Sequence, residues 1–293
     1  MASHAPVASA NPRYFVPEPS AWPFVLTVGL VAIFLGVWSY LEDRSLGSIP
    51  IYAGSALSAF IIYRWFQGVA RESEGGKYSK QVDTTYRMGM AWFIFSEVMF
   101  FAAFFGALYY TRTISVPWLG GEGAKGVANL EWTGFESAWP TNGPAALGGA
   151  FQTISAWGLP FINTCLLLTS GVTITMAHHA LKDNKRTACI VWMWATVALG
   201  VVFLICQAEE YIHAYQELNL TLGSGVYGST FFMLTGFHGM HVTLGTLMLF
   251  VITCRLMKGH FKPDSHFGFE GVAWYWHFVD VVWVGLFIFV YIL

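Results

Sequence analysis

Charged residues are scarce in this sequence. Asp, Glu, Lys and Arg make up 11% of its 293 residues, whereas a soluble domain carries about 25%. Hydrophobic residues reach 55%, and the mean hydropathy is +0.53. So few charges cannot cover a water-facing surface, which excludes a soluble protein and predicts a membrane protein. The net charge of −2 says nothing about partners, because the distribution of charge along a membrane chain matters more than its sum.

Cysteine is almost absent as well. The four cysteines, Cys165, Cys189, Cys206 and Cys254, all fall in apolar runs, and no two have C-x-x-C spacing. This excludes a disulfide framework or a thiolate metal set, and it predicts small buried side chains instead.

Sequence motifs for covalent, phosphoryl and nucleotide chemistry are missing. The chain has no G-x-x-x-x-G-K-[ST], G-x-G-x-x-G, nucleophile elbow or H-E-x-x-H motif. No feature points to a nucleic-acid partner. The first twenty residues are proline-rich, without an apolar core or an Arg-rich amphipathic pattern, so we expect neither a secretory signal nor a transit peptide.

Long apolar runs are what the sequence does have. A helix needs roughly 20 apolar residues to cross a bilayer, and runs of this kind predict an all-α polytopic protein, a single membrane domain over 1–293. Seven spans are expected, at about 21–41, 49–68, 88–110, 158–178, 188–207, 229–254 and 271–292. The Gly- and Pro-rich stretch 111–157 is expected to form an outer loop on the membrane surface.

In this seven-span arrangement, Lys and Arg are frequent in the segments on one side of the membrane and rare in those on the other. With the N-terminus inside, the inner segments hold twelve of these residues and the outer segments only Arg44, Arg112 and Lys125. The bias predicts an N-in, C-out topology.

Ionisable residues within the spans carry the functional information, because burying them in a bilayer is costly. Glu97 lies near the middle of the third span. Span six carries His238 and His241 beside Thr235, and span seven carries His277 and Asp280. Each set has a spacing of three, which places its members on one helix face. Gly236 and Gly239 are expected to let another helix approach that face of span six.

Three interpretations of this polar set stay open from the residues alone. Histidines and carboxylates together can relay protons or bind an ion, or they can form buried pairs that fix helix packing. A haem or metal site is the third, although no Met, Cys or carboxylate array completes a ligand set, so we expect no metal. The adjacent His178 and His179 are interpreted as part of a charged inner loop, and Glu209-Glu210 with His213 as a solvated helix end.

Six segments of the chain also resemble a known family. They cover 93–101, 170–181, 207–211, 225–232, 235–241 (Thr235-Gly-Phe-His-Gly-Met-His241) and 266–283, which contains Trp274-Tyr-Trp-His-Phe-Val-Asp280. In this order they resemble subunit III of cytochrome c oxidase. The quinol oxidase third subunit is similar, but it usually lacks the first two spans, which are clear here.

The resemblance implies a non-redox subunit of a proton-pumping translocase in aerobic respiration. Haem and copper would lie in partner subunits, with none in this chain. Oxidase subunit I would be the direct partner, alongside subunit II, a small subunit IV and cytochrome c as donor to the complex. The chain would support proton uptake and the integrity of the oxygen-reducing site.

The resemblance also implies where phospholipids bind. Spans one and two would form one group and spans three to seven another, separated by a cleft that holds structural phospholipids. Trp65, Arg71, Glu72 and Arg255 match its lining residues, and Glu97 matches the buried, carbodiimide-reactive glutamate of the family. The long outer loop favours a bacterial inner membrane over a mitochondrial one. A stand-alone seven-helix proton or ion transporter is the alternative from another class.

Overall fold

The structure, a computed structural model, describes residues 15–42, 47–123 and 126–293. Arg13, Arg44 and Lys125, three of the residues counted for the topology, lie outside these ranges. The described chain is all-α, apart from one isolated β-bridge between Lys262 and Ser265. It divides into two compact units, Met1–Tyr86 and Arg87–Leu293, and each is considered by itself.

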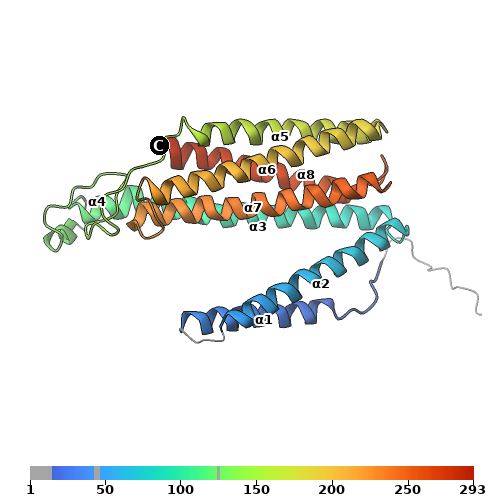
Figure 1. The fold of residues 1–293 in the computed structure, drawn as a ribbon, viewed down its shortest axis with the longest axis horizontal. Helices are drawn as coiled ribbons and strands as arrows, with labels where there is room; N and C mark the ends of the chain where they lie inside the picture. Colours follow the sequence, from blue (N-terminus) through green and yellow to red (C-terminus); the bar gives the residue numbers. More distant parts are fainter. Residues whose placement is uncertain (1–14, 43–46, 124–125) are drawn as a thin grey trace, which may run out of the picture. The chain divides into compact units, whose positions relative to one another are not determined.

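The first unit is built on an antiparallel helix pair, α1 (Trp22–Leu41) and α2 (Ser48–Glu74) (Figure 1). Small residues let the two backbones meet. A Cβ on Gly54 would lie 2.6 Å from the carbonyl oxygen of Gly29, and one on Gly36 would lie 2.7 Å from the backbone nitrogen of Ile51. The pair is therefore held by close backbone packing, as is common between helices in membranes.

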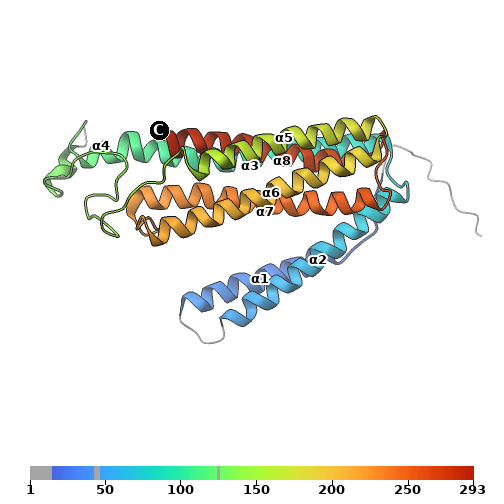
Figure 2. The ribbon, with the colours of Figure 1, turned by 45° about the horizontal axis from the view of Figure 1, so that its top comes forward.

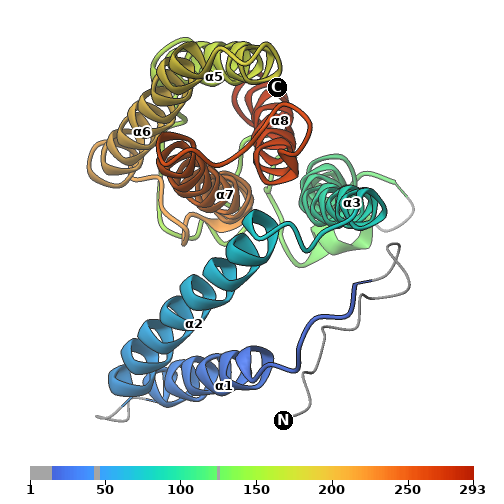
Figure 3. The same ribbon diagram turned by 90° about the vertical axis from the view of Figure 1, so that its right-hand side faces the viewer.

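The second unit contains four mutually packed helices, α5 (Leu159–Lys182), α6 (Arg186–Gln216), α7 (Gly225–Met257) and α8 (Phe267–Leu286), the last continued by the π-helical turn η3 (Phe287–Ile292). Each helix contacts the next around the bundle, and α8 closes it against α5, as the end-on view in Figure 3 shows. Helix α3 (Lys80–Tyr110) packs its aromatic side chains, including Phe100 and Phe101, onto α7 and α8.

The indole of Trp276 lies at the centre of this bundle and is fully buried. A Cβ on Gly200 of α6 or Gly245 of α7 would lie 2.9 or 2.8 Å from its ring carbons. Its Nε1–H donates to Ser170 Oγ of α5 at 2.8 Å. One side chain of α8 thus contacts all three neighbouring helices, and two glycines make the room for it.

Six helical stretches are long and apolar enough to cross a membrane by length and composition. They are Trp22–Leu41, Lys80–Leu119, Leu159–Lys182, Arg186–Gln216, Gly225–Met257 and Phe267–Ile292. Helix α2, of 27 residues, has the length but a more polar composition, with several serines and Arg64. The all-α, polytopic membrane class predicted from the sequence is confirmed, with seven long helices and six such stretches among the described residues.

Several helices extend beyond the apolar runs that revealed them. After α3 the chain continues through the π-helical turn η1 (Thr111–Ser115) and the short α4 (Val116–Leu119), so that one helical stretch covers 40 residues (Figure 2). At 1.5 Å per residue this is about 60 Å, roughly twice the hydrocarbon thickness. The start of the expected loop 111–157 is therefore helical, and a 3₁₀ turn, η2 (Gly126–Leu130), lies further along it.

Gly236 and Gly239, the glycines of α7 singled out from the sequence, are not closely packed within the described chain. No other part of the described chain lies within 4 Å of a Cβ on Gly239, and the nearest atom to one on Gly236 is 3.7 Å away. Gly245 is the close-contact glycine instead, because it faces Trp276. Sequence spacing gives the helix face, but it does not reveal where a bulky partner ring lies.

We predict that Gly245→Ala destabilises the full-length chain in detergent, because the added methyl overlaps a rigid ring; overpacking of this kind costs about 1–3 kcal/mol. Gly239→Ala is the matched control on the same helix, and it should be neutral or slightly stabilising because Ala favours helix over Gly. Thermal unfolding followed by circular dichroism measures both. Equal midpoints for the two variants would contradict this account of the core.

Candidate functional site

Glu97 of α3 pairs with His241 of α7. Its Oε2 lies 3.1 Å from His241 Nε2, and the two side chains are 22% and 7% exposed. The other ring nitrogen, Nδ1, lies 2.6 Å from the carbonyl oxygen of Phe237, an acceptor, so Nδ1 carries a proton. The contact between Nε2 and Glu97 then holds one further proton, on either the carboxyl or the ring.

Aromatic rings enclose this pair. Phe101 packs edge-on against the His241 ring at 5.0 Å, and Tyr275 stacks on it at 6.3 Å. Phe100 and Phe278 lie on other sides. In such an apolar setting a polar group must find its partner locally, because an unpaired one is costly. The pair therefore works as a bond between α3 and α7.

His238, three residues earlier, faces a different part of the bundle. It is fully buried, donates from Nε2 to the carbonyl oxygen of Val279 at 3.2 Å, and packs on Trp283 at 5.1 Å. Its role in the geometry is to join α7 to α8.

His277 and Asp280 of α8 face α5. His277 Nδ1 lies 3.8 Å from Asp280 Oδ2, and its Nε2 lies 3.4 Å from Thr175 Oγ1. A Cβ on Gly171 would lie 2.6 Å from Asp280 Oδ2, so this glycine makes room for the carboxylate. Among the described residues, the predicted polar set thus divides into separate pairs, and only His241 contacts Glu97.

The residues expected to bind lipid lie at helix ends. Arg71, in the last turn of α2, is exposed, and Trp65 before it is half-buried. Glu72 accepts a hydrogen bond from the Tyr78 hydroxyl at 2.9 Å. Burial, with Tyr86 and Glu72 nearby, raises the pKa of Tyr78, so this hydroxyl stays a donor. In the second unit, Arg255 lies 4.5 Å from the centre of the Phe261 ring and donates from Nε to His260 Nδ1.

Sequence analysis missed two further buried carboxylates. Glu210, interpreted as part of a solvated helix end, is 1% exposed and accepts a hydrogen bond from the Tyr291 hydroxyl at 2.5 Å. Glu270 lies in the first turn of α8 and forms an ion pair with Arg87 of α3 at 2.5 Å. Counting apolar runs between charges places such residues outside the spans. The i, i+4 spacing of His266 and Glu270 was the available signal.

The fold and these pairs define a class: an all-α, multi-pass membrane protein whose buried histidines and carboxylates join neighbouring helices. The family model described as cytochrome c oxidase subunit III matches residues 12–293. Cytochrome c oxidase subunit 3 of Hippopotamus amphibius is 38% identical over 279 residues, covering 95% of this chain and 96% of that protein. That of Pongo abelii is 39% identical over 288 residues, covering 97% and 98%.

The chain therefore belongs to the cytochrome c oxidase subunit III family, as the sequence motifs indicated. It is a multi-pass membrane protein and a subunit of the cytochrome c oxidase complex.

We predict that Glu97→Gln leaves the chain assembled in the oxidase, because the amide can still hydrogen-bond to His241 Nε2. Glu97→Leu should reduce assembly, since it leaves that buried nitrogen unpaired at a cost of about 1–3 kcal/mol. The measurement is the amount of this chain that co-purifies with tagged subunit I. Equal loss of the chain in both variants would show that the hydrogen bond is not what matters.

Proposed function

We propose that the chain is the non-redox core subunit of a proton-pumping cytochrome c oxidase, packing on subunit I and supporting proton uptake and the integrity of the oxygen-reducing site. Family membership over residues 12–293 supports this. The observation that carries it is the local pairing of the polar groups within the helices. Glu97 pairs with His241 of α7 at 3.1 Å, and on α8 His277 Nδ1 lies 3.8 Å from Asp280 Oδ2. Such groups suit a packing subunit better than a stand-alone proton transporter.

We propose, further, that all seven long helices cross the membrane in the N-in, C-out sense, as two groups formed by the first two and the last five. The length of α2, 27 residues, and the division of the chain near Tyr86 support this arrangement. A bacterial inner membrane is the proposed location, on the basis of the long outer segment 111–157.

Phospholipid binding is part of the same proposal. Arg71 lies in the last turn of α2, the helix that also carries Trp65, and Arg255 lies beside the Phe261 ring at the end of α7. Basic groups beside aromatic rings at a membrane border suit a lipid phosphate. Glu72, tied to Tyr78, fixes the turn that follows α2.

Purification of the chain from native membranes tests the proposed function. We expect it to co-purify with oxidase subunits I and II in equal amounts, and we expect no proton flux when the chain alone is placed in liposomes. Flux through the isolated chain, or a chain that purifies without those subunits, would favour the transporter.

Arg71→Ala and Arg255→Ala are expected to release bound phospholipid from the purified oxidase before they slow its initial electron-transfer rate. Lys77→Ala and Lys258→Ala are the controls, because these exposed lysines lie within a few residues of the two arginines. Native mass spectrometry counts the lipids. Unchanged lipid content in both arginine variants would refute the assignment of these residues.

A further inference from the structure

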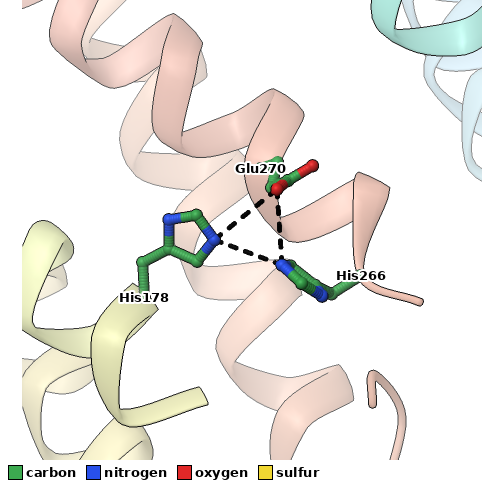
Figure 4. A group of neighbouring side chains, drawn as sticks. All are labelled: His178, His266 and Glu270. Carbon is green, nitrogen blue, oxygen red and sulfur yellow. Dashed lines mark hydrogen bonds and ion pairs between the residues drawn. The ribbon is translucent and has the colours of Figure 1, made fainter. Parts of the chain in front are cut away.

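Two histidines and a glutamate meet where α5 ends and α8 begins (Figure 4). His178 lies one turn before the end of α5, His266 is the N-cap residue of α8, and Glu270 lies in the first turn of that helix. Their side chains are 22%, 6% and 10% exposed. All three belong to the second unit.

The three facing atoms form a nearly equilateral triangle. His178 Nε2 lies 3.2 Å from His266 Nε2. Glu270 Oε1 lies 3.4 Å from His266 Nε2 and 3.7 Å from His178 Nε2. In a tetrahedral zinc site with bonds of about 2.0–2.1 Å, two ligand atoms are about 3.3–3.4 Å apart. An octahedral site with the same bonds would need about 2.9 Å, so the triangle fits a tetrahedral ion better.

In two of the three side chains, His266 and Glu270, the atom that faces away from the triangle has its own partner. His266 donates from Nδ1 to the carbonyl oxygen of Lys262 at 3.0 Å, which leaves the lone pair of Nε2 facing His178 and Glu270. The second oxygen of Glu270 is paired with Arg87 at 2.5 Å, which leaves Oε1 for the same centre. Partners of this kind orient ligands in known metal sites.

Hydrogen bonding within the triangle is incomplete when both histidines are neutral and Glu270 is ionised. With its Nδ1 protonated, neutral His266 offers only a lone pair at Nε2, and Glu270 Oε1 is also an acceptor. A single proton on His178 Nε2 can satisfy one of these two acceptors, and the other is then left facing a lone pair at 3.4 Å. A cation at the centre removes that repulsion.

We propose that His178, His266 and Glu270 form a Zn²⁺ site of His₂Glu type with one further coordination position. The ion would link the end of α5 to the start of α8. The ion pair between Glu270 and Arg87 would connect this site to α3. Arg87 and Lys182 lie nearby and oppose a second positive charge. The site therefore takes up zinc reversibly, more weakly than a thiolate site.

The test is zinc uptake by the purified oxidase, stripped with a chelator, reloaded with Zn²⁺ and desalted. We expect His178→Ala and His266→Ala to bind one zinc fewer per complex than the unmodified protein. His179→Ala is the matched control, because His179 is the neighbouring residue, is exposed and lies outside the triangle. It should keep the full amount. Equal zinc in all four proteins would overturn the proposal.

If the alanine variants fail to assemble, a His266→Cys variant still tests the site, because it keeps a metal ligand at this position. A thiolate at this position should keep the metal, add a Zn–S distance of about 2.3 Å in X-ray absorption, and favour Cd²⁺ over Zn²⁺ relative to the unmodified protein. A role in hydrogen bonding alone predicts no such change. An unchanged spectrum and an unchanged ratio of bound Cd²⁺ to Zn²⁺ would rule the site out.

Discussion

The second unit depends on the placement of one indole ring. Trp276 fills the space that Gly200 and Gly245 leave open, and its N–H is satisfied by Ser170. In a bilayer the apolar surroundings give little hydrophobic drive between helices, so close packing and hydrogen bonds must hold them together. The Trp276 ring supplies close packing against the glycines of α6 and α7 and a hydrogen bond to α5. It thereby fixes the rotation of α8, and with it the direction of every polar side chain that α8 carries.

That rotation decides how the ionisable residues are distributed. Asp280 and His277 face α5, and Glu270 faces both Arg87 and the end of α5. The Phe278 ring packs against the His241 ring, with 6.4 Å between the ring centres. The ionisable groups of α8 therefore lie at separate helix junctions, although some of their buried atoms, such as Asp280 Oδ1, have no hydrogen-bond partner among the described residues. These junctions give the bundle specific helix pairings.

The sequence was sufficient for the helices and for the family, and insufficient for the junctions. Apolar runs between charges reveal the helices, because the bilayer imposes their length. The same rule missed Glu270 and Glu210, because it took these two charges as ends of spans, whereas both are buried against partners far along the chain. It also did not single out Gly245, where a Cβ would meet the ring of Trp276, whereas a Cβ on Gly239 would have no other part of the described chain within 4 Å. His178 and His266 are separated by 88 residues, and only the fold brings them together.

Glu97, the most conspicuous residue of the sequence, is another case in which the sequence alone does not decide the role. A lone carboxylate in the middle of an apolar span is a default candidate for proton transfer. Its partner changes that interpretation, because His241 already gives one ring proton to the Phe237 carbonyl and shares a single further proton with Glu97. To pass a proton onward, the pair would need an acceptor on its far side, and the rings of Phe100, Phe101, Tyr275 and Phe278 occupy the surroundings of His241. Within the described chain, the carboxylate forms one half of the pair that joins α3 to α7.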